Sequence, residues 1–276
     1  MIEIPECAAL ARQLNETVRG LGIVEASAGA APHGFAFYSG SPARYGDLLT
    51  GRAVQDSRAF GGILEIGLDG LLLLLNDGAN LRYHRPGSPV PEKHQLFLRF
   101  DNDSALTCTV QMYAGIHLCE DGSYHSVYHQ AAREKPSPLT DDFSEDHFMA
   151  MASQSGKLSA KAFLATEQRI PGLGNGVLQD ILFCARINPK TKVSALSPED
   201  LGRLYRQIRE TLREMTRLGG RDTEKDLFGQ PGGYATLMSR NALEKPCPGC
   251  GGIVRRESYM GGNVYVCPAC QPIIKA

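Results

Sequence analysis

Four cysteines near the C-terminal end carry the most specific chemical signal in the chain. Cys247 and Cys250 form a C-P-G-C pair, and Cys267 and Cys270 form a C-P-A-C pair sixteen residues later. Zinc in structural sites is held by four ligands in a closed tetrahedron, and each pair supplies two thiolates. The residues between the pairs alternate in character, which indicates a β-hairpin. We predict one structural zinc ion per chain, with disulfides or a redox pair as the alternative.

A glycine-rich turn, IPGLGN at 170–175, is the second signal. It precedes an expected helix over 175–186. Backbone N–H groups at such a helix start face an anion, and phosphate is a common guest. The alternative is a plain connection between two helices. The other four cysteines lie in mostly apolar patterns, which favours buried free thiols: Cys7, Cys108, Cys119 and Cys184.

The first half of the chain is expected to position these groups on a β-rich scaffold. A helical pattern begins at Pro5 and ends before Gly20 and Gly22. Strand-like runs separated by turn signals such as Asp69-Gly70 follow. The runs lie at 62–67, 71–75, 81–83, 96–100 and 105–113. They predict an antiparallel β meander, arranged as a sandwich with the first helix packed against it.

The second half reads as helical. The segment 130–140 contains two prolines and many polar residues, which indicates a linker. Asp141 or Ser144 could cap a short helix, Ser159 another through Gln168, and Ser197 a long one that ends near residues 219–220. The expected fold class is α+β, with boundaries at 1–130 (β-sandwich), 131–140 (linker), 141–240 (helical domain) and 241–276 (zinc finger).

The charge is unevenly distributed. The chain has a net charge of −1, but residues 1–150 carry 11 Lys/Arg against 19 Asp/Glu, and residues 151–276 carry 18 against 11. A polyanion would be drawn to the second half, with a solvated helical surface as the alternative. No apolar run approaches the ~20 residues that span a bilayer. With no secretory signal evident, a cytoplasmic location is expected, at the nucleoid in a bacterium.

Four stretches together resemble the formamidopyrimidine-DNA glycosylase / endonuclease VIII (Fpg/Nei) family. They are MIEIPE at the N-terminus, IPGLGNGVLQDILFCARINP from residue 170, GGRDTEKDLFG at 219–229, and the terminal cysteine hairpin ending CPACQ. The resemblance spans nearly the whole chain. It implies a β-sandwich, a helix–two-turn–helix module and a zinc finger, with double-stranded DNA bound between the halves. The partner would be DNA with a damaged base or abasic site, and the expected state is a monomer.

The resemblance also assigns DNA-binding residues. Gly174 and Asn175 match the loop that holds phosphates flanking the lesion, and Lys161 matches a lysine with a similar role. A solvated helix lysine is the alternative for Lys161. The arginine that fills the space left by the flipped base falls at Gln111 or Met112. Met112 and its neighbour Tyr113 could serve as apolar wedges instead.

The family's catalytic pattern is altered at the N-terminus. The family uses the amine of a proline directly after the initiator methionine as the nucleophile, and here Ile2 stands there. Glu3, the proton-shuttling acid, and Glu6 match the pattern. If Met1 is removed, the primary amine of Ile2 could still form an imine. Methionine is normally trimmed only before small residues, however, and if Met1 stays, the amine is displaced by up to ~3.5 Å. Glu3 is then a working acid/base, an exposed N-terminal acid, or a structural relic hydrogen-bonded to backbone.

Two cationic phosphate contacts are also lost. An ungapped alignment on Glu65 places Phe60 where the family has a lysine, and Gly262 replaces the arginine of the zinc hairpin. Three hypotheses follow. The chain is a glycosylase and abasic-site lyase with altered or weakened chemistry, a non-catalytic lesion binder, or a zinc-ribbon module for RNA or protein. The sequence does not choose the lesion.

Overall fold

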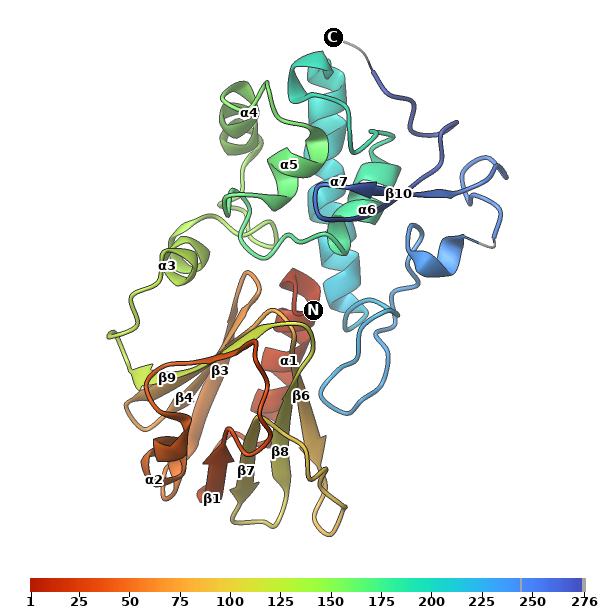
Figure 1. Cartoon of the computed structure of the whole chain (residues 1–276). Helices are drawn as coiled ribbons and strands as arrows, with labels where there is room; N and C mark the ends of the chain where they lie inside the picture. The colour runs from red at the N-terminus through yellow and green to blue at the C-terminus, as the bar shows by residue number, and fades with distance from the viewer. Residues whose placement is uncertain (244, 275–276) are drawn as a thin grey trace.

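The computed structural model describes residues 1–243 and 245–274. It has a β-rich half and a helical half, with the N-terminus between them (Figure 1). Helix α1 (Ile4–Thr17) begins at a capping box, in which the Glu3 carboxylate accepts from backbone and Glu6 reaches back to the N-cap N–H. It buries one face, including Leu10 and Leu14, against β3 and β4. The predicted first helix is confirmed.

The β-rich half contains two sheets. One has the order β1-β7-β8-β6 and the other β2-β9-β5-β4-β3. The strands are β1 (Ile23–Ala28), β2 (Ala36–Tyr38), β3 (Val54–Phe60), β4 (Ile63–Leu68), β5 (Leu71–Asn76), β6 (Ala79–His84), β7 (Leu96–Phe100), β8 (Ala105–Val110) and β9 (Ala114–Glu120). The short helices in this half are η1 (Pro42–Arg44), α2 (Tyr45–Leu49) and α3 (Val127–Glu134).

The predicted α+β class and β-sandwich are confirmed, but the meander is wrong in its connections. Strand β2 pairs parallel to β9, and β6 is separated from β7 by β8. The run expected at 105–113 ends at Val110, because Met112 takes a left-handed conformation with φ 66° and turns the chain from one sheet to the other. Helix α3 was not expected, and it includes the first residues of the 131–140 segment.

The helical half follows the predicted caps. The side chains of Ser144, Ser159 and Ser197 each accept from the backbone N–H three residues later. Helix α5 ends earlier than expected, because Glu167 and Gln168 have positive φ values of 56° and 48°. The elements are α4 (Glu145–Ser153), α5 (Ala160–Ala165), α6 (Val177–Cys184), η2 (Val193–Ala195), α7 (Pro198–Arg217) and η3 (Arg240–Ala242).

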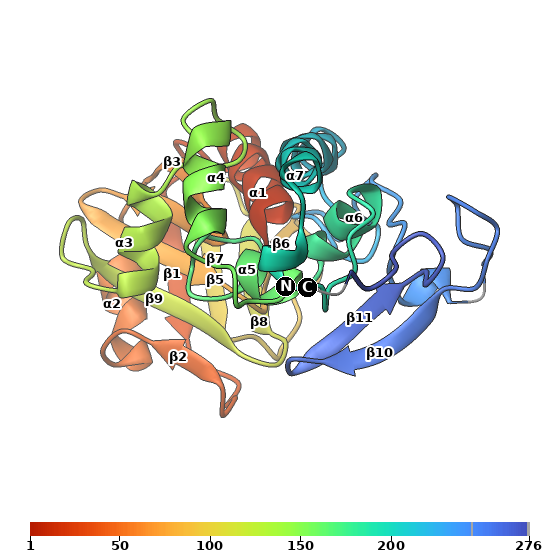
Figure 2. The same cartoon turned by 90° about the horizontal axis from the view of Figure 1, so that it is seen from above.

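The cysteine hairpin is formed by β10 (Arg255–Tyr259) and β11 (Gly262–Val266), as predicted. Figure 2 shows its turn pointing back toward the strands of the sandwich. Among the described residues, no helix is long and apolar enough to cross a bilayer. The two halves are tied by the N-terminal segment: the Ile2 side chain is part of the sandwich core, and Ile4 is part of the helical core.

Candidate nucleic-acid site

The N-terminal segment is fixed at the junction of the two halves. The backbone nitrogen of Ile2 donates to the carbonyl oxygen of Asp77 at 2.6 Å, and that of Ile4 donates to the carbonyl oxygen of Gly172 at 3.1 Å. The side chains of Ile2 and Ile4 are buried in different cores. The residue between them is therefore held in one place by the sandwich and by the glycine-rich turn together.

The Glu3 carboxylate occupies the anion position of that turn. It accepts from the backbone N–H groups of Gly174 at 3.2 Å, Gly176 at 2.9 Å and Val177 at 2.9 Å. The approach is close enough that a Cβ on Gly174 or Gly176 would lie 2.6–2.8 Å from Glu3 atoms. An anion at the start of α6 is what the sequence predicts. In this structure the anion at these N–H groups is the protein's own Glu3 carboxylate.

Arg221, which sequence reasoning missed, completes this cluster. Its side chain is 2% exposed. Its Nε and Nη2 donate to the two carboxylate oxygens of Glu6 at 2.9 and 2.8 Å, and its Nη1 lies 3.5 Å from Oε1 of Glu3. Burial alone would lower the pKa of Arg221, but the Glu3 and Glu6 carboxylates raise it, so the guanidinium stays charged.

Nothing local in the sequence marks Arg221 as buried, since it follows two glycines in the polar stretch 219–229. The same stretch reaches the chain's amino group. The Met1 amine lies 2.6 Å from a carboxylate oxygen of Glu224, and the Leu227 side chain is fully buried in the sandwich core. The stretch therefore packs along the N-terminal segment.

Lys161 and Asn175 meet at the turn of the cysteine hairpin. Lys161 is 5% exposed and donates through Nζ to the carbonyl oxygen of Tyr259 at 2.6 Å, so the expectation of a solvated lysine is wrong. Burial lowers the pKa of Lys161. Asn175 donates through Nδ2 to the carbonyl oxygen of Asn263 at 3.1 Å. A Cβ built on Gly262 would lie 3.5 Å from Lys161 Nζ and 3.6 Å from Asn175 Nδ2.

Three positions that the resemblance links to phosphate thus lie together in space, although 101 residues separate the outer two in the sequence. The position expected to carry the hairpin arginine has no side chain. The position where the resemblance expects a strand lysine also has no cation. It is occupied by Phe60 at the end of β3, whose ring lies 5.0 Å from the Arg133 guanidinium carbon. The Arg133 side chain also lies 3.4 Å from Glu65, so this cation is already partnered.

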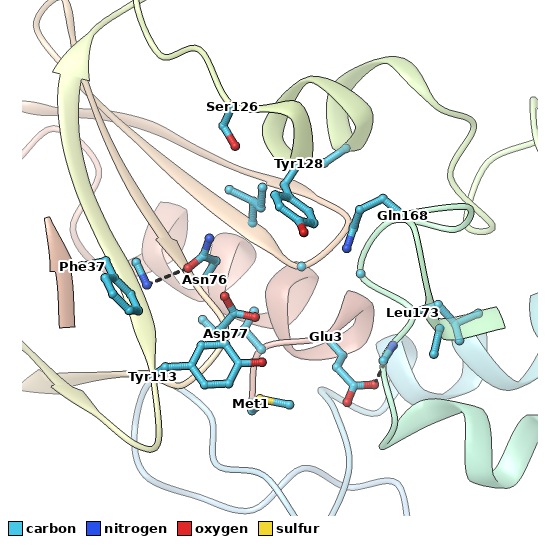
Figure 3. Close-up of a pocket in the computed structure, with 18 of the residues that line it drawn as sticks. Met1, Glu3, Phe37, Asn76, Asp77, Tyr113, Ser126, Tyr128, Gln168 and Leu173 are labelled. Atoms are coloured by element: carbon cyan, nitrogen blue, oxygen red, sulfur yellow. Dashed lines mark hydrogen bonds between the residues drawn. The ribbon is translucent and has the colours of Figure 1, made fainter. Parts of the chain in front are cut away.

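The predicted wedge residues lie at the turn between β8 and β9. Met112 is 67% exposed and Tyr113 is 41% exposed. Tyr113 borders a cavity of about 620 Å³ that also contacts Met1, Ile2, Glu3, Gly174 and Asn175. Figure 3 shows Tyr113 and Met1 side by side at this cavity, with Glu3 bonded to the turn. Tyr113 and the N-terminal segment therefore border the same cavity.

The four C-terminal cysteines form a metal-ligand cluster. Their sulfur atoms all lie within 4.8 Å of one another. The Sγ atoms of Cys247 and Cys270 are 3.8 Å apart, and those of Cys250 and Cys267 are 3.5 Å apart. These distances exceed a disulfide bond of about 2.05 Å. They fit the ~3.8 Å edge of a sulfur tetrahedron around a zinc ion with bonds of about 2.3 Å. The disulfide alternative is therefore wrong, and the donor set fits a metal.

Comparisons with known proteins agree with this geometry. The family model described as the formamidopyrimidine-DNA glycosylase H2TH domain matches residues 135–226. The formamidopyrimidine-DNA glycosylase of Geotalea uraniireducens (strain Rf4) is 30% identical over 233 residues, which cover 81% of this chain and 84% of that protein.

Solved structures show the same architecture over nearly the whole chain. The MutM (Fpg) protein from Thermus thermophilus matches with a TM-score of 0.81 at 25% identity, covering 98% of this chain and 99% of that one. The Lactococcus lactis Fpg in complex with abasic-site DNA has the same fold, with a TM-score of 0.83 at 22% identity and the same coverage. The chain belongs to the formamidopyrimidine-DNA glycosylase family.

Proposed function

We propose that this protein binds duplex DNA carrying a damaged base or an abasic site, with base-excision and lyase chemistry weaker than that of proline-bearing relatives. The observation that carries the binding proposal is the family membership over most of the chain, together with a relative of the same fold solved on abasic-site DNA. The DNA-facing surface would include Lys161, Gly174 and Asn175. The wedges inserted between base pairs of the DNA duplex would be Met112 and Tyr113.

The weakened chemistry is supported by the contacts of the N-terminal segment. The nucleophile of the family is an amine. With Met1 retained, the nitrogen of Ile2 is an amide, and it donates to the carbonyl oxygen of Asp77. The free amine lies on Met1, in an ion pair with Glu224. A protonated, paired amine is a poor nucleophile, and attack requires approach to roughly 3–3.5 Å in a defined direction.

Glu3 and Glu6 would then act as positioning residues, not as proton shuttles. The Glu3 carboxylate already accepts hydrogen bonds from three backbone N–H groups. The Glu6 carboxylate accepts hydrogen bonds from Nε and Nη2 of Arg221. Their role would be to hold the helix–two-turn–helix loop against the β-sandwich at the place where DNA passes.

We further propose that the metal is zinc, held by Cys247, Cys250, Cys267 and Cys270. Zinc would hold the hairpin folded and leave no open coordination position for chemistry. The domain boundaries 1–130, 131–140, 141–240 and 241–276, a monomeric state, and a cytoplasmic, nucleoid-associated location complete the proposal. The hairpin's turn would reach DNA together with Lys161 and Asn175.

Equilibrium binding by fluorescence anisotropy tests the proposed function. Three labelled probes of the same sequence are compared: duplex DNA with one central abasic site, undamaged duplex DNA, and duplex RNA. We expect at least tenfold tighter binding to the abasic duplex than to either of the others, at a stated salt concentration because phosphate contacts depend on salt. Equal affinity for the RNA probe would favour the zinc-ribbon RNA-binding alternative and contradict the proposal.

A further inference from the structure

Two exposed methionines have an unusual backbone conformation. Among the residues that the structure describes, eight besides glycine have a left-handed φ, and only two of these eight are apolar, Met112 and Met260. Their φ values are 66° and 51°, and they are 67% and 47% exposed. A left-handed backbone is strained for a residue with a side chain, and such strain gathers at ligand-binding sites. Both methionines are therefore candidates for a binding role.

Met260 lies at the tip of the cysteine hairpin. Tyr259 pairs with Gly262 across the hairpin, which leaves Met260 and Gly261 as a two-residue loop. Both loop residues have positive φ values, 51° and 70°, as a type I′ turn requires. Asparagine followed by glycine is the pair that this turn prefers. The turn itself therefore does not explain a methionine at its first position.

The tip of the hairpin is held beside an expected DNA-facing residue. The Ser159 hydroxyl, at the start of α5, donates to Met260 Sδ at 3.6 Å. The Lys161 Nζ, on the same helix, donates to the carbonyl oxygen of Tyr259 at 2.6 Å. Figure 2 shows the hairpin turn pointing toward the sandwich, which is the half that carries Met112. Met260 is therefore fixed on one side by α5, and about half of it remains exposed.

The tip has no charge of its own with which to bind phosphate. None of the residues from Ser258 to Asn263 is acidic or basic. The group that the tip exposes is a flexible, polarizable thioether side chain. Proteins that bind the minor groove of DNA insert apolar side chains, methionine among them, at base steps. The contact that this tip can make with a duplex is therefore apolar.

We propose that Met260 makes a second apolar contact with duplex DNA, from the cysteine hairpin against the sugars and bases of the minor groove. The proposal rests on the proposed function for duplex DNA as the partner. It goes beyond the predicted wedge at Met112, because the new contact comes from the other half of the molecule. It lies at the turn where Gly262 stands in place of the expected arginine. Because the contact is apolar, it neutralises no phosphate and adds nothing to the salt dependence of binding.

Met260→Asn tests the contact without harming the hairpin. Asparagine suits the type I′ turn and removes the apolar side chain, so we expect a melting temperature no lower than that of wild type. We expect abasic-duplex affinity, measured by fluorescence anisotropy, to fall by about fivefold or more, because the burial of a methionine side chain is lost. Ile253→Asn, at a 76% exposed position outside the turn, is the matched control and should stay within about twofold of wild type. Unchanged affinity in Met260→Asn, or an equal loss in Ile253→Asn, would overturn the proposal.

The salt dependence of binding separates a lost apolar contact from a displaced lysine. If Met260→Asn only moved Lys161 away from a phosphate, the slope of log affinity against log salt would become shallower by about one. We expect Met260→Asn to keep the slope of wild type. A shallower slope would assign the loss of affinity to Lys161 and would overturn the proposal.

Methyl NMR locates the contact directly and separates it from the proposed function. The chain has seven methionines, and labelling with [methyl-13C]methionine gives one signal for each. The Met260 signal is identified by its loss in Met260→Asn. In complexes with abasic and with undamaged duplex we expect this signal to shift, because bases lie against the methyl group, while the buried Met215 and Met238 signals stay in place. A Met260 shift with both duplexes would support the contact even if the preference for abasic DNA fails. No Met260 shift at saturating duplex would overturn it.

Discussion

At the scale of single residues, the contacts of Glu3, Glu6 and Arg221 explain how the N-terminal segment is held. The Arg221 guanidinium forms ion pairs with the buried carboxylates of Glu3 and Glu6. Glu3 also accepts hydrogen bonds from three backbone N–H groups. A buried charge is tolerated only when it is paired and hydrogen-bonded, and removing one member of the set leaves the others uncompensated. Arg221 therefore stabilises the junction between the two halves.

Arg221→Met tests that role. It preserves much of the side-chain volume but leaves Glu6 buried without a cation, so we expect the free energy of unfolding to fall by about 3–5 kcal/mol. Urea denaturation followed by circular dichroism gives this value. The exposed Arg206→Met on α7 is the matched control and should stay within about 0.5 kcal/mol of wild type. A loss below about 1 kcal/mol in Arg221→Met would show that the buried pair is unimportant.

Gly262 allows a gain of function at the hairpin turn. An arginine there would start 3.5 Å from Lys161 Nζ and 3.6 Å from Asn175 Nδ2, and its long side chain could turn outward to a phosphate. We expect Gly262→Arg to tighten abasic-duplex binding about threefold or more. It should also steepen the dependence of log affinity on log salt by about one, because one more phosphate is neutralised. Ile253→Arg, at an exposed position that follows the first cysteine pair, is the control; an equal effect there would indicate nonspecific charge.

At the scale of elements, the cysteine hairpin supports the expected DNA-facing residues. The carbonyl oxygens of Tyr259 and Asn263, on its two strands, fix Lys161 and Asn175 respectively. The described residues place no large core inside the hairpin, whose buried apolar cluster is small and includes Cys247 and Cys267. Such an element would depend on a metal bound by the four cysteines for its folding.

Metal removal should therefore act locally. We expect one zinc per chain by elemental analysis, and loss of abasic-duplex binding by at least tenfold after chelation, with the circular dichroism of the remaining domains retained. Cys267→Ala should reproduce both effects. Cys119→Ala, a half-buried cysteine on β9, should change neither the zinc content nor the affinity. Full affinity in metal-free protein would contradict a supporting role for the hairpin.

Local elements were predictable because their signals are local. Helices α1 and α7 begin with capping residues and proline in the first turn, and the hairpin at Asp69-Gly70 has the turn chemistry its strands require. The parallel pairing of β2 with β9 was not predictable, since Ala36 and Ala114 are far apart in the sequence and periodicity does not name a partner.

At the scale of the whole molecule, the site was predictable in part. The family motifs located the cysteine cluster, the turn and the N-terminal segment. The identity of the anion in the turn was not predictable, because Glu3 lies 173 residues from Gly176 in the sequence. The contact between Arg221 and Glu6 was not predictable for a similar reason, because 215 residues separate them in the sequence. The composition shows that the numbers of acidic and basic residues are nearly equal, but it does not show which of these side chains form ion pairs. That depends on how the two halves pack together.

The fold as a whole brings the β-sandwich, the helix–two-turn–helix loop and the cysteine hairpin around the N-terminal segment, where Ile2 stands at the position expected to hold the nucleophilic proline. Borohydride trapping on an abasic duplex tests the central claim most directly, because it converts an imine to a stable protein–DNA bond. A duplex whose abasic aldehyde is reduced beforehand is the control. We expect a native gel shift on the abasic duplex, with trapping at least a hundredfold slower than in a proline-bearing relative. Trapping at the relative's rate would contradict weakened chemistry.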